Sequence, residues 1–188
     1  MTSSRSSRVS RTVATVSAIG SVALLAACAS GPMGGGMAFS QADLPASVQV
    51  PAGNRVAWET VGRGDITYEC KDNAGKTEWV FGGPNAVLTD RSGKAVGKYY
   101  GPPATWEAND GSKLTATQLA IAPAGAGNLP YQLVKANPAM GSGAMTGVTY
   151  IQRVALKGGV APDLPCNAST RGQKATVKYQ ADYIFWKA

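Results

Sequence analysis

The sequence predicts an all-β fold, either an antiparallel β-sandwich or a closed barrel of meander hairpins, with one disulfide. Three observations predict it. From about Leu44 onward, apolar residues recur at every second position, and hairpin turn sequences separate these segments. No long stretch has the spacing of a helix. Two cysteines remain for one cross-link once Cys28 is assigned a separate role.

The N-terminus is typical of a secretory signal peptide, which we assign to residues 1–27. Arg5, Arg8 and Arg11 precede an apolar run and no acidic residue accompanies them. The run is shorter than the roughly 20 residues that a membrane-spanning helix needs. We therefore expect it to be absent from the folded protein.

The run ends in Leu25-Ala26-Ala27-Cys28, which resembles the lipobox of bacterial lipoproteins, where the cysteine is acylated and becomes the first mature residue. Cys28 is thus the predicted lipidation site and the membrane the predicted partner, because two or three acyl chains anchor a domain stably. Ordinary signal-peptide cleavage beside the small residues Ala27 and Ala29 is the alternative. A neutral Ala29 resembles the signal for the outer membrane, so we expect a lipoprotein of the cell envelope that faces the periplasm.

Residues 28–43 are rich in glycine, alanine and serine and have no periodic apolar face, which predicts a flexible tether. Residues 44–188 then form one all-β domain, long enough to bury a core.

Assigning Cys28 to lipid leaves Cys70 and Cys166, which we predict to form a disulfide in an oxidising compartment. A catalytic thiol is the alternative. It lacks support because the chain contains no histidine to act as its base.

Two segments define the strand faces clearly. In residues 65–71, Ile66, Tyr68 and Cys70 share one face, and in residues 175–186 one face carries Val177, Tyr179, Ala181, Tyr183 and Phe185. The second segment is long and we expect it to lie in the middle of a sheet.

Turn sequences join further strands in order. They are DNAG before residues 77–81, RSG before residues 94–101 and NDGS before residues 113–122. In residues 145–159, Val148, Tyr150, Gln152 and Val154 are predicted to lie opposite Thr149, Ile151 and Arg153. Residues 131–137 fit either a short strand or one helical turn.

Glu107 and Asp110 raise the question of a catalytic pair of carboxylates. The sequence Asn109-Asp110-Gly111-Ser112 is a strong hairpin signal, so we interpret Asp110 as a turn residue. Trp106 and Glu107 are neighbours in an extended segment and must face opposite ways. A glycosidase needs two facing carboxyls, one of them with a raised pKa. We therefore identify no catalytic residue.

A set of aromatic and polar residues would suit a glycan or small-molecule ligand, the aromatic rings by stacking and the others by hydrogen bonding. The candidate ligand-binding residues are Trp79, Tyr99, Tyr100, Trp106, Glu107 and Arg153. The alternative, stronger for Trp79 and Trp106, is that these aromatic rings fill the core.

Composition excludes several classes of function. Without histidine there is neither a Ser-His-Asp triad nor a histidine-ligated metal, and the carboxylates are too dispersed to predict a metal site. No phosphate-binding glycine loop follows a strand, so no cofactor is expected. The net charge of +7 includes three arginines of the signal peptide and the remaining basic residues are scattered, so no nucleic-acid partner is expected.

Several segments in succession resemble the bacterial and fungal family called domain of unknown function 3455. They are Tyr68-Glu69-Cys70, Trp79-Val80-Phe81 with the following residues to Ser112, VTYIQRVALKGGVAPDLPC at 148–166 and YQADYIFW at 179–186. The resemblance implies an exported or surface-associated domain without an established activity and supplies no site residues.

The expected function is therefore that of an exported, lipid-anchored envelope protein, and we favour a non-catalytic module that binds a ligand or partner over an enzyme. The alternative is a carboxylate-dependent enzyme acting on envelope glycan through Glu107 and Asp110.

Overall fold

The computed structural model describes residues 39–188, so the predicted signal peptide and Cys28 lie outside the described residues. Within that range the chain is almost entirely β-structure and its helical part is a single 3-10 turn, η1 (Ala46–Val48). No helix among these residues is long and apolar enough to cross a membrane.

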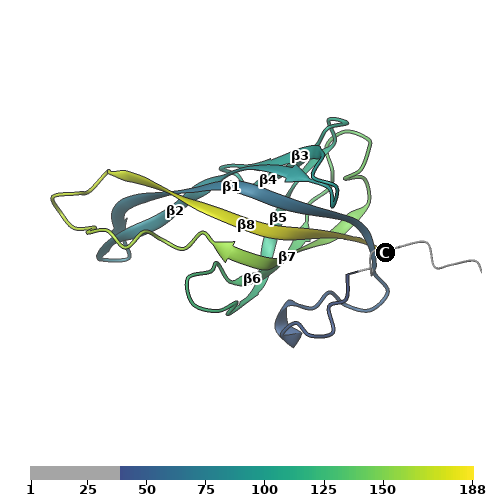
Figure 1. Cartoon of the computed structure of the whole chain (residues 1–188), viewed down its shortest axis with the longest axis horizontal. Coiled ribbons are helices and arrows are strands. Elements are labelled where there is room, and N and C mark those ends of the chain that lie inside the picture. The colour runs from purple at the N-terminus through teal and green to yellow at the C-terminus, as the bar shows by residue number, and fades with distance from the viewer. Residues whose placement is uncertain (1–38) are drawn as a thin grey trace, which may run out of the picture. The chain divides into compact units, whose positions relative to one another are not determined.

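Eight antiparallel strands form a closed barrel in which each strand pairs with its neighbours in the chain and β8 also pairs with β1 (Figure 1). The predicted all-β meander is confirmed, and the closed barrel is the architecture that forms. The strands are β1 (Arg55–Asn73), β2 (Lys76–Thr89), β3 (Ala95–Tyr100), β4 (Thr105–Ala108), β5 (Lys113–Ala122), β6 (Tyr131–Ala136), β7 (Val148–Gly158) and β8 (Lys174–Lys187).

The two ends of the barrel carry different connections. At the end we call the disulfide end lie the β1–β2 turn and residues 101–104, 123–130 and 159–173. At the other end, the plug end, lie residues 90–94, 109–112 and 137–147. Figure 1 shows β1, β2 and β8 extending well past the shorter strands at the disulfide end.

The predicted faces of β1 and β8 are confirmed. Ile66, Tyr68, Tyr183 and Phe185 belong to one buried cluster that fills the barrel. β8 pairs along both edges, with β1 and with β7, as its central position in the sheet requires. The ambiguous segment 131–137 is a strand, because β6 completes the ladder between β5 and β7.

The predicted faces of β7 are wrong at one position. Tyr150, Gln152 and Val154 lie on the outer face, but Val148 packs with Ile151 in the buried cluster that fills the barrel. The register of β7 against β8 shifts between Val148 and Tyr150, and such a bulge reverses the alternation of side chains on one side of it.

The loop 137–147 closes the plug end. Met145 in this loop is fully buried in the cluster that fills the barrel. Asp110 and Ser112 hold the loop, since Asp110 Oδ2 accepts a hydrogen bond from the Ala144 N–H at 2.7 Å and Ser112 Oγ accepts one from the Met145 N–H at 3.1 Å. The NDGS turn thus connects β4 to β5 and also fixes the loop 137–147, which we call the plug.

Residues 39–50, which we call the N-terminal strap, pack on the outer face of the barrel. Val48 and Val50 form a second buried cluster with residues of β5 to β8, and Phe39 and Leu44 pack against it. Gln152, fully buried on β7, donates a hydrogen bond to the Val48 carbonyl at 2.7 Å. Residues 39–43, expected within the tether, therefore contact the barrel.

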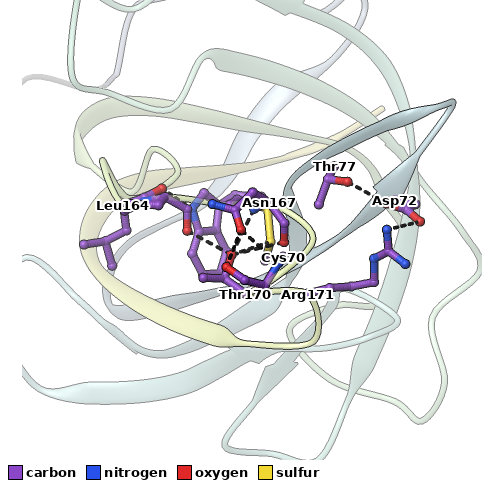
Figure 2. The surroundings of a disulfide bond; sticks show 11 residues. Cys70, Asp72, Thr77, Leu164, Asn167, Thr170 and Arg171 are labelled. Atoms are coloured by element: carbon purple, nitrogen blue, oxygen red, sulfur yellow. Dashed lines mark hydrogen bonds and ion pairs between the residues drawn. A yellow bond between two sulfur atoms is a disulfide. The ribbon is translucent and has the colours of Figure 1, made fainter.

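The predicted disulfide between Cys70 and Cys166 is confirmed, and it joins β1 to the β7–β8 connection. Figure 2 shows Thr170 and Asn167 of this connection beside the bridge. The Cys70 carbonyl accepts a hydrogen bond from the Gly172 N–H at 2.7 Å, and the Cys70 N–H donates one to the Gln173 carbonyl at 2.9 Å. The bridge and these bonds hold the connection against the long β1–β2 hairpin.

Candidate functional site

The barrel interior contains a set of polar and aromatic side chains toward the disulfide end, which we call the interior cluster. Alternation places each of them on an inward position, and they come from five strands, β1, β3, β4, β7 and β8. The members are Tyr68, Tyr99, Trp106, Arg153, Tyr179 and Tyr183.

Three rings of the interior cluster are in mutual contact. Tyr99 stacks on Trp106 with ring centroids 4.5 Å apart and an interplanar angle of 19°. Tyr183 lies 5.0 Å from Tyr99 and meets Trp106 edge to face at 5.8 Å. Such pairs add about 0.5–1.5 kcal/mol each beyond the area they bury, so these rings form a rigid wall.

Arg153 is the cation of the interior cluster. It is only 8 % exposed, and its register partner on β8 is Tyr183. Its Nε and Nη2 donate to the Pro130 carbonyl at 3.3 and 3.0 Å. Within residues 39–188 no carboxylate forms an ion pair with it. Buried charges are normally paired, and the unbonded N–H groups of Arg153 are not among the fully buried unsatisfied atoms, so they remain accessible to water or a ligand.

Burial dominates the electrostatics of the tyrosines. It raises the pKa of Tyr99 to about 12 and raises the pKa values of Tyr179 and Tyr183 above their ordinary value, because a phenolate would lose its hydration. The positive charge of Arg153 acts in the opposite direction on all three pKa values. The guanidinium therefore lies close enough to influence each hydroxyl.

Some hydrogen-bonding groups of the interior cluster have partners and others do not. The Tyr68 hydroxyl donates to the Gly159 carbonyl at 2.7 Å, and the hydroxyls of Tyr179 and Tyr183 share a bond of 3.2 Å. Trp106 Nε1 is buried and has no acceptor among the described residues. Buried donors without partners are rare in folded proteins, and each needs an explanation such as water or a ligand.

The structure brings together three of the six predicted ligand-binding residues, Tyr99, Trp106 and Arg153. Trp79 lies apart from them on the β1–β2 hairpin, where it is the register partner of Cys70. Its Nε1 donates to the Leu164 carbonyl at 2.9 Å. Trp79 therefore holds the disulfide-bonded connection in place.

The remaining two, Tyr100 and Glu107, lie on the outer face of the barrel. Glu107 accepts a hydrogen bond from the Tyr100 hydroxyl at 2.7 Å and pairs with Lys98 Nζ at 3.1 Å. These partners lower the pKa of Glu107, the Tyr100 bond contributing most. The side chain thus stays ionised in a surface cluster.

Glu107 and Asp110 do not form an acid–base pair. The pKa of Asp110 is also lowered, first by the Ser112 hydroxyl and then by the Ala144 N–H. A hollow of about 240 Å³ beside Glu107 has Lys98, Asn109 and backbone in its lining but no second carboxylate. A general acid needs a carboxyl with a raised pKa, and neither residue has one.

Metal chemistry has no donor set in the described part of the chain. Residues 39–188 contain no group of three histidine, cysteine, aspartate or glutamate side chains placed to hold an ion. The interior cluster contains neutral hydroxyls and a guanidinium, which repels cations.

The alternation in residues 65–71 and 175–186 predicts that Tyr68, Tyr179 and Tyr183 face inward, but it does not connect them with Arg153. Their spacing along β1 and β8 was visible in the sequence. What was missing was the register, which pairs Arg153 with Tyr183 across β7 and β8. That register depends on bulges at both ends of β7.

Comparison with known proteins connects this fold to a family. Searches of curated proteins and of solved structures found no match for the chain. The model of the family described as "Protein of unknown function (DUF3455)" matches residues 51–187, which include all eight strands and both cysteines of the disulfide. The chain therefore belongs to the DUF3455 family of proteins of unknown function.

Proposed function

We propose that this protein is an exported, lipid-anchored protein of the cell envelope whose barrel binds a small molecule without catalysing a reaction. The observation that carries the binding role is the interior cluster, which combines a buried cation without a counter-ion and a buried indole N–H without an acceptor. Polar groups with free hydrogen-bonding capacity in a mostly apolar interior are characteristic of binding sites.

A binding role is favoured over catalysis by the kinds of residue in the interior cluster. Its tyrosine hydroxyls have raised pKa values and stay protonated at neutral pH, so no phenolate is available to act as a general base. The four carboxylates of Glu59, Asp65, Glu107 and Asp182 all pair with surface lysines or arginines instead. None of these four carboxylates is therefore placed to transfer a proton to or from a ligand in the interior cluster.

Export is supported by the signal-like N-terminus and by the cysteine count. Of three cysteines, Cys70 and Cys166 form a disulfide, a bond typical of oxidising compartments. This leaves Cys28, behind its lipobox-like tripeptide, as the thiol available for acylation.

An anchor at Cys28 is compatible with access to the barrel. Phe39, the first described residue, donates its N–H to Glu59 and packs its ring on Trp186, near the start of β1 and the end of β8. The chain therefore enters the domain beside the plug end. The disulfide end, toward which the interior cluster lies, is at the other end of the barrel.

The binding role is tested by titrating the purified protein with small envelope-derived molecules and following tryptophan fluorescence and thermal stability. A ligand in the interior cluster changes the emission of Trp106 and raises Tm. Trp106→Phe should remove the fluorescence response and, because the indole N–H belongs to the proposed site, should also reduce the Tm shift. A panel of glycan fragments, lipids and metabolites that changes neither signal would contradict the proposal.

The anchor is tested by intact-mass measurement of protein purified from membranes. We expect loss of residues 1–27 and added acyl mass at Cys28. Cys28→Ala should release the protein from the membrane fraction. A mass equal to that of the full sequence, with the leader attached, would rule out both processing steps.

A further inference from the structure

We propose that the interior cluster binds a small organic monoanion through its carboxylate group, with Arg153 as the carboxylate partner and the Tyr99–Trp106 stack as the wall for its apolar body. This inference rests on the proposed binding function and specifies its ligand class.

The geometry of the Arg153 guanidinium leaves one edge of its fork free. Nε and Nη2 both donate to the single carbonyl of Pro130, which occupies the side of the group. A guanidinium has five N–H groups, of which these bonds use two, so three have no acceptor within residues 39–188. The unused N–H groups of Nη1 and Nη2 form the end of the fork, which matches the two oxygens of a carboxylate.

The surroundings of Arg153 supply further donors and no competing anion. Trp106 Nε1 is buried and unpaired, and the Tyr99 hydroxyl, in a side chain only 4 % exposed, has no hydrogen bond within the described residues. No carboxylate of residues 39–188 forms an ion pair with the guanidinium. A site with surplus N–H and O–H groups and one fixed positive charge is complementary to an anion.

A monoanion fits better than a phosphate. Arg153 is the single cation of the interior cluster, so a dianion would retain an uncompensated charge in an apolar interior. Leu156, Val134 and Leu129 belong to the buried cluster that fills the barrel, so the surroundings of Arg153 are otherwise apolar. A carboxylate attached to an aliphatic or aromatic body satisfies both the charge and the apolar walls.

The disulfide end is the side from which such a ligand would enter. Arg153, Tyr68 and Tyr99 retain 8 %, 6 % and 4 % exposure, and Pro130, which accepts the hydrogen bonds of Arg153, lies in the connection 123–130 at this end. Exposed apolar side chains also gather in elements at the disulfide end: Phe81, Ile121, Val160 and Leu164. They would contact the part of a ligand that extends out of the barrel.

The test compares ligands of one shape that differ in charge. Benzoate and octanoate, with benzamide and octanamide as neutral counterparts, are titrated into the purified full-length processed protein by calorimetry at pH 7. We expect at least one acid to bind tenfold or more tightly than its amide, because charge-assisted bonds are about twice as strong as neutral ones. This comparison uses the wild-type protein and needs no variant to fold.

Arg153→Met removes the charge while keeping an apolar side chain of similar length. We expect it to weaken binding of the acid about tenfold to a hundredfold and to leave the amide within twofold. Lys157→Met, four residues along on the same strand but exposed, is the matched control and should leave both affinities unchanged. Circular dichroism establishes that each variant is folded.

The outcomes separate this inference from the proposed function. Equal binding of acids and amides, or an acid affinity unaffected in a folded Arg153→Met protein, would overturn the carboxylate assignment and leave the binding role intact. If no acid or amide binds but another molecule shifts Tm, the ligand class is wrong. If nothing in the wider panel binds, both proposals fail.

Discussion

Trp186 Nε1 donates a hydrogen bond to the side-chain oxygen of Gln152 at 2.9 Å, and both side chains are covered by the N-terminal strap. The amide nitrogen of Gln152 bonds to Gln41 and to the Val48 carbonyl. One glutamine thus connects β7, β8 and the strap. Because Gln152 is fully buried, each of these partners would lack water if the amide were removed.

Replacing Gln152 by leucine should therefore lower the free energy of unfolding, although the two side chains are similar in volume. We expect a loss of about 2–4 kcal/mol in the free energy of unfolding, because several buried polar groups lose their partner. Urea unfolding measures it. Gln118→Leu, at an exposed amide that bonds only to Gln132, is the control and should change stability by no more than about 0.5 kcal/mol. Equal effects of the two changes would contradict the role given to Gln152.

The disulfide closes a loop of 96 residues. On the chain-entropy model such a cross-link stabilises by about 4–5 kcal/mol. The double variant Cys70→Ala with Cys166→Ala should lose about that much in urea unfolding. Reductant should lower the stability of the wild-type protein to the level of the variant and leave the variant unchanged. A reduced wild-type protein as stable as the oxidised one would show that the bridge does not constrain the unfolded chain.

The stability of the folded protein should fall at acid pH because the Asp110 carboxylate, which holds the loop 137–147, becomes protonated. Its pKa is lowered in the folded protein by the Ser112 hydroxyl and the Ala144 N–H. The carboxylate therefore stabilises the fold above its ordinary pKa of about 4, and this contribution is lost as the pH falls through the lowered value. Asp110→Asn should unfold at lower urea concentration than wild type at pH 6, with the difference shrinking toward pH 2.

The control variant is Asp90→Asn. The pKa of Asp90 is also lowered by a turn serine, Ser92, but Asp90 does not contact the loop 137–147. Only Asp110→Asn should expose Met145, which is fully buried, to oxidation by peroxide. Met140, at 49 % exposure, should be oxidised in every variant. Protection of Met145 in a folded Asp110→Asn protein would show that the plug does not need this carboxylate.

The strands were predictable because their evidence is local. Alternation in residues 65–71 and 175–186 and the turn residues of NDGS needed no knowledge of the rest of the chain. One feature, the order of the N-terminal strap, depends on distant contacts and was missed. The strap is ordered by Gln152 and Trp186, more than a hundred residues away, although Phe39 and Leu44 show no period of their own.

The interior cluster was predicted only in part, because its assembly also depends on contacts between distant strands. Arg153, Tyr99 and Trp106 were recognisable as residue types that bind ligands. Their meeting point depends on the register of β7 and β8, which bulges shift at two places. Tyr100 and Glu107 were grouped with them by proximity in sequence, but neighbours in a strand face opposite sides of a barrel wall.

The tyrosines of the interior cluster predict an alkaline limit to stability. Burial raises the pKa of Tyr99 to about 12 and raises that of Tyr183 as well, while an unfolded chain loses these protons near pH 10. A raised folded-state pKa gives stability below pH 10 that is lost as the pH rises from 10 to 12. Tyr183→Phe and Tyr99→Phe should each make the urea midpoint fall less steeply over this range. An unchanged slope in both variants would mean that these hydroxyls titrate in the folded barrel as they do in water, and so that the interior is wet rather than dry around Arg153.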